Sequence, residues 1–153
     1  MDGRVTIIGM GESAGDLSAT ACRALAEANL IIAAPRFQAS LAKQIGNTAT
    51  LMAWPRPYGD VFNVIEQAKN QTIVICATGD PMWFGAGSGI VERFGLGRCA
   101  IIPHVSGFQM AAARMGWALD ECETVTIHGR PPESILPYIY RRGRILLLAE
   151  DHA

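Results

Sequence analysis

The chain has 153 residues, of which 50% are hydrophobic and 18% are charged, and its formal net charge is -1. This length and apolar content suit one compact α/β unit or two small lobes, and they exclude a disordered chain. The near-neutral charge offers no basic field for nucleic acid, so we expect none to bind. The N-terminus lacks the features of a signal peptide, and no apolar run is long enough to span a membrane. We therefore expect a soluble, cytoplasmic protein with no membrane partner.

Strands and helices are predicted to alternate along nearly the whole chain. The strands, each an apolar or β-branched run, are expected at residues 4–9, 30–34, 50–54, 72–77, 99–103, 123–127 and 144–148. Helices fit between them at residues 18–28, 35–45, 61–68, 85–94, 106–115 and 133–141. This alternation predicts an α/β fold with a mostly parallel sheet that is covered by helices on both faces.

The stretch from Gly116 to Glu121 follows a helix whose periodic pattern has ended. We expect a hinge there. Residues 1–116 would then form an N-terminal α/β lobe with the Gly-rich and Gly-Asp-Pro loops, and residues 117–153 would begin a second lobe.

Cysteines and histidines are scattered along the chain. The four cysteines, Cys22, Cys76, Cys99 and Cys122, lack the paired spacing of a disulfide frame or zinc site, which favours reduced, buried small hydrophobes. The three histidines, His104, His128 and His152, include no helical i, i+4 pair. The sequence therefore implies no metal.

An acidic turn, Gly79-Asp80-Pro81, follows the predicted strand at residues 72–77. It stands at the carboxyl end of a buried strand, where α/β folds bind their ligands. Glycine lets a ligand approach the backbone, and one carboxylate lies among apolar and aromatic neighbours, as in a cofactor cleft. The turn is equally compatible with a strand-ending loop in which the aspartate caps a helix.

The turn from Gly9 to Ala14 follows the first strand and matches the loose dinucleotide pattern G-x-G-x-x-A. It would suit an NAD(P)-dependent oxidoreductase, in which Arg36 would read a 2′-phosphate. However, Ala33 and Ala34 stand where a ribose-binding acid belongs, and Glu12 would face the pyrophosphate with like charge. A glycine turn for tight chain reversal is favoured, and the oxidoreductase remains an alternative.

Several segments, read in order, resemble the tetrapyrrole methylases. They are residues 5–12, 35–37, 78–85, 103–106, 111–116 and 126–131. The pairing of the Gly-Asp-Pro loop with the later His-Gly-Arg segment is more specific than either motif alone. Within the family, the chain is most similar to the branch that methylates carbon 5 of precorrins.

This resemblance implies an S-adenosylmethionine-dependent methyltransferase of cobalamin biosynthesis, with two α/β lobes that commonly pair as a homodimer. It implies that Thr78, Gly79, Asp80 and Trp83 line the cofactor pocket and that Val105, Ser106 and Gly107 form a second wall. Gly9, Gly11 and Glu12 would close the substrate side. The precorrin of such an enzyme carries many carboxylates, and Arg130, Arg114, Arg36 and Arg56 are arginines able to hold them, with Arg130 expected to contact the substrate. The family normally continues beyond residue 148, so the second lobe is expected to be truncated, and a non-catalytic scaffold lobe is a further alternative.

Methyl transfer between such partners needs little help from side-chain chemistry. A sulfonium methyl is electrophilic and a reduced tetrapyrrole carbon is electron-rich, so the protein mainly aligns the two and excludes water. Base chemistry is limited to removing a ring proton. His128 is the candidate catalytic residue for that step.

Overall fold

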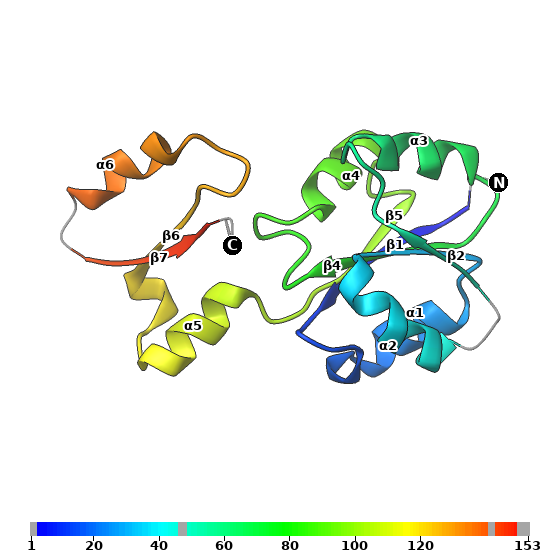
Figure 1. Ribbon diagram of the computed structural model, residues 1–153, viewed down its shortest axis with the longest axis horizontal. Helices are drawn as coiled ribbons and strands as arrows, with labels where there is room; N and C mark the ends of the chain where they lie inside the picture. Colours follow the sequence, from blue (N-terminus) through cyan, green and yellow to red (C-terminus); the bar gives the residue numbers. More distant parts are fainter. Residues whose placement is uncertain (1–2, 46–48, 141–142, 150–153) are drawn as a thin grey trace. The chain divides into compact units, whose positions relative to one another are not determined.

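The computed structural model describes residues 3–45, 49–140 and 143–149. The chain divides into two compact units, Met1–Val105 (unit 1) and Ser106–Ala153 (unit 2). Unit 1 contains a five-stranded sheet and unit 2 a two-stranded sheet, and Figure 1 labels most of the helices and strands of both.

The sheet of unit 1 has the strand order β3-β2-β4-β1-β5. The strands are β1 (Val5–Met10), β2 (Leu30–Ala33), β3 (Thr50–Ala53), β4 (Ile73–Thr78) and β5 (Cys99–Ile102). Every neighbouring pair is parallel. All five strands therefore end at one edge of the sheet, which we call the carboxyl edge.

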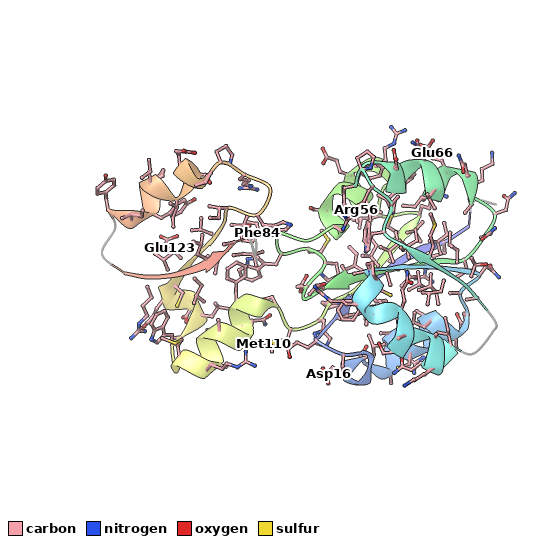
Figure 2. The ribbon with its side chains drawn as sticks, in the orientation of Figure 1. Asp16, Arg56, Glu66, Phe84, Met110 and Glu123 are labelled. Atoms are coloured by element: carbon pink, nitrogen blue, oxygen red, sulfur yellow. The ribbon has the colours of Figure 1, made fainter. Side chains whose placement is uncertain are left out.

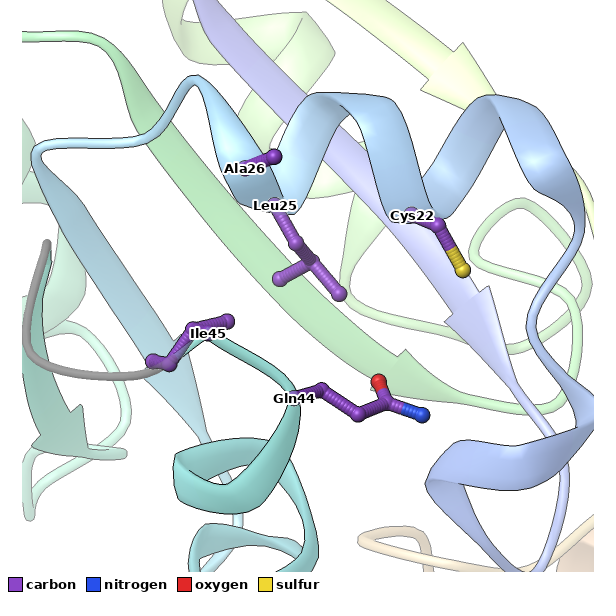
Figure 3. Close-up of a pocket in the computed structure, with 5 residues that line it drawn as sticks. All are labelled: Cys22, Leu25, Ala26, Gln44 and Ile45. Carbon is purple, nitrogen blue, oxygen red and sulfur yellow. The ribbon is translucent and has the colours of Figure 1, made fainter.

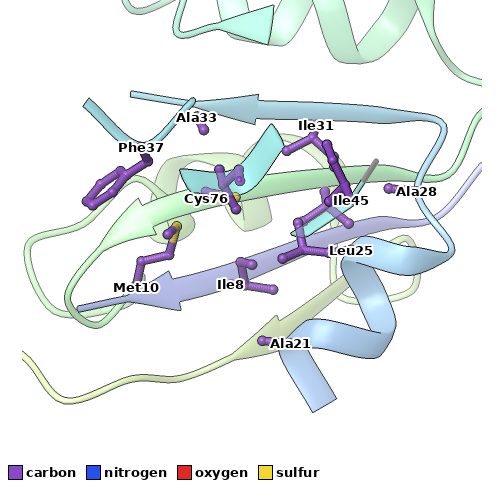
Figure 4. Close-up of a cluster of buried hydrophobic side chains, with 12 residues drawn as sticks. Ile8, Met10, Ala21, Leu25, Ala28, Ile31, Ala33, Phe37, Ile45 and Cys76 are labelled. Atoms are coloured by element: carbon purple, nitrogen blue, oxygen red, sulfur yellow. The ribbon is translucent and has the colours of Figure 1, made fainter. Parts of the chain in front are cut away.

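Four helices cover the two faces of this sheet, with α1 (Ala19–Ala26) and α2 (Pro35–Ile45) on one face and α3 (Asp60–Gln67) and α4 (Gly87–Phe94) on the other (Figure 1). Alternate strand residues pack on opposite faces. Ile8, Met10, Ile31 and Cys76 meet Leu25 and Phe37 on the first face (Figure 4), and Ile7, Ile73 and Ile75 meet Val61, Ile65 and Ile90 on the second. Parallel sheets require such burial on both sides. The predicted α/β fold with two covered faces is confirmed.

Unit 2 is built around the parallel pair β6 (Cys122–Thr126) and β7 (Arg144–Leu148). Its other elements are α5 (Gly107–Met115), α6 (Leu136–Ile139) and the short 3-10 turns η2 (Leu119–Glu121) and η3 (Pro132–Ile135). Its buried core consists of Phe108, Ala112 and Leu146, with Trp117 and Leu119 packed against it.

The division between the units differs from the boundary expected near Gly116. Phe108 and Ala112 on α5 pack against Leu146 on β7, so α5 belongs to unit 2. Gly116 has a φ of 65° and forms the left-handed cap of α5. Its position in the sequence therefore marks the end of a helix rather than the end of a lobe.

The helix expected at residues 133–141 is replaced by η3 and α6. Pro137 has no backbone N–H, so it cannot make the α-helical hydrogen bond to the carbonyl of Glu133. The N–H of Leu136 makes a tighter 3-10 bond to that carbonyl instead. Residue 141 lies outside the described residues. The bounds of the other predicted strands and helices agree with the structure to within two residues at each end.

All four cysteines are free thiols. Cys76 and Cys99 are buried as expected, but Cys122 is half-buried and Cys22 is exposed. Cys22 is exposed because α1 turns a different part of its surface, that of Ala21 and Leu25, toward the core. Within the described ranges, no group of His, Cys, Asp or Glu side chains could hold a metal ion, and His152 lies outside those ranges. The described helices include none that is both long and apolar enough to cross a membrane.

Candidate functional site

The loops after β1, β4 and β5 meet at the carboxyl edge of unit 1. Strand β1 lies between β4 and β5, and its last residues Gly9 and Met10 pair with Ala77 and Thr78 of β4. After β4 the chain thus crosses to the other side of β1, where it forms β5. Open α/β sheets bind ligands at crevices of this kind, outside the carboxyl ends of their strands.

Gly9 allows these loops to approach closely. A Cβ atom on Gly9 would lie 2.4 Å from the carbonyl oxygen of Gly79 and 2.5 Å from the Cβ of His104. The N–H of Gly79 donates to the carbonyl of Met10 at 2.7 Å, and Gly79 has a left-handed φ of 67°. Glycine is required at both positions, because a side chain at Gly9 has no room and one at Gly79 would be strained.

His104 connects the loops after β1 and β5. Its Nε2 lies 3.0 Å from the carbonyl oxygen of Asp16, and its Nδ1 lies 3.2 Å from that of Val105. Gly11 packs against the same ring, since a Cβ there would lie 3.2 Å from Cε1 of His104. Asp16, labelled in Figure 2, ends the 3-10 turn η1 (Ala14–Asp16). His104 was not among the site residues expected from the sequence, whereas the structure places it beside Gly11 and Val105, which were.

The first turn does not have the form of a dinucleotide-binding loop. In such loops a helix opens directly after the glycines and its N-terminus binds the pyrophosphate. Here η1 separates Gly11 from α1, whose N-cap Ser18 accepts a hydrogen bond from the N–H of Ala21 at 3.2 Å. Gly9 and Gly11 instead let the neighbouring loops pack closely against the chain. The structure therefore favours a glycine turn for chain reversal over the dinucleotide-binding loop of an oxidoreductase.

The Gly79-Asp80-Pro81 loop is folded tightly on itself. Oδ1 of Asp80 accepts a hydrogen bond from the N–H of Met82 at 2.8 Å. The N–H of Gly87 donates to the carbonyl of Pro81 at 2.8 Å. Beyond the carboxylate, Trp83 is 41% exposed. The loop therefore offers a fixed negative charge and a flat apolar surface at the carboxyl edge.

Arg36 reaches the same edge from the first turn of α2. Strand β2 pairs with β4, so the start of α2 lies beside the end of β4. Nη2 of Arg36 donates to Oγ1 of Thr78 at 2.6 Å, and its guanidinium carbon lies 4.7 Å from the ring centroid of Phe37. Arg36 and Thr78 are 42 positions apart in the sequence. No local signal could have linked them, because their contact depends on the strand order.

An aromatic pair stands at the end of β3. The rings of Trp54 and Tyr58 stack with centroids 5.3 Å apart, and Nε1 of Trp54 donates to the carbonyl of Cys76 at 3.3 Å. Burial raises the pKa of Tyr58 above its usual value, and it raises that of Cys76 to about 12. Cys76 is therefore a protonated thiol under the site and not a nucleophile.

The predicted site residues are divided between the two units. Unit 1 brings Gly9, Gly11, Glu12, Thr78, Gly79, Asp80, Trp83 and Val105 to the loops of its carboxyl edge. Ser106 and Gly107 begin α5 in unit 2. Ser106 is buried, and its hydroxyl accepts from the N–H of Gln109 in a capping box. Its side chain is therefore already engaged in capping the N-terminus of the helix.

His128 and Arg130 follow β6 in unit 2, and both are exposed. Buried Thr126 holds this turn, because its Oγ1 accepts from the N–H of His128 at 3.1 Å and donates to the carbonyl of Leu148 at 3.4 Å. Gly129 has a left-handed φ of 67°. The backbone at His128 is thus fixed to the end of the two-stranded sheet.

A hollow of about 470 Å³ lies elsewhere in unit 1 (Figure 3). It is lined by Cys22, Leu25 and Ala26 of α1 and by Gln44 and Ile45 of α2. Both helices run back from the carboxyl edge, so their C-terminal ends lie toward the opposite edge of the sheet. The hollow has mostly apolar walls, and the converging polar loops favour the carboxyl edge as the site.

Comparison with known sequences gives a consistent match. The sequence model of the tetrapyrrole (corrin/porphyrin) methylases matches residues 4–151. A decarboxylating precorrin-6Y C(5,15)-methyltransferase of Sinorhizobium sp is 31% identical over 150 residues, which are 97% of this chain and 36% of the relative. A cobalt-precorrin-7 C(5)-methyltransferase of Salmonella typhimurium is 29% identical over 127 residues, 82% of this chain and 62% of the relative. The chain thus spans about a third of the first relative and less than two thirds of the second.

Solved structures show the same fold. A precorrin-6Y methylase from Archaeoglobus fulgidus aligns with a TM-score of 0.72 at 23% identity and covers 97% of this chain and 74% of that one. The methyltransferase CobJ aligns with a TM-score of 0.71 at 25% identity over 90% of this chain and 62% of that one. A diphthine synthase reaches a TM-score of 0.74 at 17% identity, with 97% of this chain and 64% of that one covered. A likeness that extends to diphthine synthase speaks for the fold alone.

Proposed function

Because this chain belongs to the tetrapyrrole methylase family, we propose that it transfers a methyl group from S-adenosylmethionine to carbon 5 of a precorrin in cobalamin biosynthesis. The observation that carries this proposal is the match of nearly the whole chain to relatives that are named as methyltransferases at that carbon. The chain covers only part of each relative. That this chain is active by itself is therefore also part of what we propose.

The chemistry of the carboxyl edge of unit 1 supports the proposal that S-adenosylmethionine binds there. When bound, this cofactor supplies an electrophilic methyl group on a sulfonium sulfur. Asp80 offers a carboxylate for its amino group, and Gly79, which has no side chain, would permit close approach. Trp83 offers an exposed ring surface. We assign these residues and Thr78 to cofactor binding.

The second wall of the cofactor site is proposed at Val105, Ser106 and Gly107. Val105 is 48% exposed, so its side chain is accessible to a ligand. Ser106 would act through its backbone, because its hydroxyl caps α5. A Cβ on Gly107 would meet nothing within 4 Å, so a ligand would have open space at this position.

The chain's own residues would mainly align the two reactants and exclude water. We place Gly9, Gly11 and Glu12 on the substrate side and Arg130 on a carboxylate of the precorrin. His128 would accept, at an imidazole nitrogen, the proton that the methylated carbon loses. Thr126 would position it through the hydrogen bond to its backbone. A homodimer, the lack of a nucleic-acid partner and a cytoplasmic location remain predictions.

Calorimetric titration tests the cofactor assignment. S-adenosylhomocysteine should bind the parent chain, and NADPH should not. Asp80→Ala should weaken binding of S-adenosylhomocysteine by about 1–3 kcal/mol, since it removes both a charge and the acceptor for the Met82 N–H. Glu92→Gln, an exposed change on α4, is the matched control and should bind like the parent.

Asp80→Asn separates the two contributions of this side chain. The amide keeps an oxygen that can accept from Met82 but lacks the charge. Weak binding by both variants would mean that the carboxylate contacts the ligand, whereas normal binding by Asp80→Asn would mean that Asp80 only shapes the loop. Binding of NADPH in place of S-adenosylhomocysteine would contradict the proposed function.

A further inference from the structure

We propose that Arg36 binds a carboxylate of the substrate and so helps to select polycarboxylate tetrapyrroles. This inference rests on the proposed function and adds to it a substrate-binding residue in unit 1. It follows from the position, the charge and the preorganised geometry of the Arg36 side chain.

The strand order places Arg36 beside the candidate cofactor loop. Ile32 of β2 pairs with Ile75 of β4, and the two strands run in parallel, so the residues that follow them leave the sheet side by side. Arg36 donates to Thr78, and Thr78 immediately precedes Gly79 and Asp80. A carboxylate bound by Arg36 would therefore lie next to the loop assigned to the cofactor.

Arg36 keeps its charge available for a ligand. Ion pairs join Arg93 to Glu66 and Arg144 to Glu121, and within the described ranges no ion pair is found for Arg36. Its residue is exposed, and the Thr78 hydroxyl is a neutral acceptor. A guanidinium has five N–H donors in a planar fork, so one bond to Thr78 leaves others for a bidentate carboxylate contact.

Other arginines of unit 1 are engaged away from this edge. Arg98 donates to the carbonyls of Gly3 and Ile65, each at 3.2 Å, and lies over the Phe94 ring. Arg23 donates to Oγ1 of Thr20 at 3.1 Å within α1. Arg36 makes the same kind of arginine-to-threonine bond as Arg23, but its bond reaches the candidate site.

Two neighbours hold the Arg36 guanidinium in place before any ligand arrives. Thr78 accepts its N–H at 2.6 Å, and the buried ring of Phe37 lies 4.7 Å from its central carbon. A side chain that is already oriented loses less conformational entropy when it binds. Lysine would keep the charge but lose both the fork and the flat stacking surface.

The test compares tetrapyrroles with different numbers of carboxylates. Uroporphyrin III, with eight carboxylates, and mesoporphyrin IX, with two, are titrated into the full chain by fluorescence quenching, with S-adenosylhomocysteine binding measured in parallel. Arg36→Gln should weaken uroporphyrin binding by about tenfold or more, because a charge-assisted hydrogen bond is lost. Arg36→Lys should fall between this variant and the parent.

Controls distinguish a local contact from a general loss of positive charge. Arg23→Gln removes the same charge from α1 and should leave all affinities within twofold of the parent. Thr78→Val removes the hydroxyl that orients Arg36 and should weaken uroporphyrin binding less than Arg36→Gln does. Added salt should reduce uroporphyrin affinity more in the parent than in Arg36→Gln.

The outcomes separate this inference from the proposed function. If the parent binds S-adenosylhomocysteine and uroporphyrin and Arg36→Gln binds both equally well, the role of Arg36 is refuted and the proposed function stands. If the parent binds neither ligand, both are refuted. A selective loss of uroporphyrin affinity in Arg36→Gln, with S-adenosylhomocysteine affinity unchanged, supports the assignment.

Discussion

The two units of this chain support their candidate site residues in different ways. In unit 1 every residue of β1 is buried, and helices cover both faces of the sheet. In unit 2 the sheet has two strands, and Leu147 and Leu148 of β7 are 41% and 40% exposed. Two-stranded sheets with small cores are marginally stable. The proposed cofactor loops are thus supported by a large core, whereas His128 and Arg130 are supported by a small one.

This difference has a consequence for function. Positions fixed by a close-packed core vary little, and catalysis by alignment depends on such precision. We therefore expect cofactor binding to depend mainly on unit 1, and the proposed substrate-binding residues of unit 2 to be more sensitive to mutations of their own small core.

The largest effect is expected from Gly9→Ala in unit 1. The new Cβ would lie 2.4 Å from the carbonyl oxygen of Gly79 and 2.5 Å from the Cβ of His104, and neither backbone nor a short side-chain stem can move easily. The free energy of unfolding, measured with urea, should fall by about 3 kcal/mol or more. S-adenosylhomocysteine binding should be lost with it.

Gly89→Ala in α4 is the matched control for this change. A Cβ there would meet only the Phe62 ring at 3.9 Å, an ordinary contact, and alanine is the better helix former. Its unfolding free energy should stay the same or rise by up to about 1 kcal/mol. Equal stability of Gly9→Ala and the parent would show that the loops at the carboxyl edge are not closely packed.

A smaller effect, confined to unit 2, is expected from Leu146→Ala. Leu146 is 8% exposed and packs against Phe108 and Ala112, so its loss should cost about 2–4 kcal/mol. Leu148→Ala, at a 40% exposed position on the same strand, should cost less.

Hydrogen exchange should show where the Leu146→Ala damage lies. We expect amides of β6 and β7 to lose protection while those of β1 and β4 keep it. Loss of protection in both units at once would mean that they unfold as one cooperative body, and the contrast between them would then have no energetic meaning.

The sequence predicted the elements better than their arrangement. Each strand was recognisable as an apolar or β-branched run, and strand-helix alternation implied a parallel sheet. The insertion of β4 between β2 and β1 depends on pairing between residues such as Ile75 and Ile32, which are far apart in the chain. The end of α5 at Gly116 was visible, but the packing of Phe108 on Leu146, which decides the unit to which α5 belongs, was not.

The same limit applies to the candidate site. The Gly-Asp-Pro turn could be recognised in the sequence because its glycine, aspartate and proline are adjacent and each favours a turn by its own local chemistry. The contacts of Arg36 with Thr78 and of His104 with Asp16 join residues 42 and 88 positions apart. Neither contact leaves a local pattern, so only the folded chain could show them.

The smallest predicted effect concerns His104, whose ring joins two loops of unit 1. His104→Ala removes the ring, so the carbonyls of Asp16 and Val105 lose a partner. Both residues are exposed, and water can replace the lost hydrogen bonds. The unfolding free energy should therefore fall by only about 1 kcal/mol.

His104→Phe distinguishes the hydrogen bonds of this residue from its packing. Phenylalanine keeps a ring against Gly11 but has no nitrogen atoms to meet the two carbonyls. If the hydrogen bonds hold the first loop, amides of residues 11–18 should exchange faster in both variants, while β1 stays protected. His128→Ala, a histidine change in unit 2, should leave this exchange unaltered. Parent-like exchange in His104→Phe would show instead that ring packing alone holds the loop. Close packing, and not hydrogen bonding by His104, would then keep this loop ordered at the carboxyl edge of unit 1.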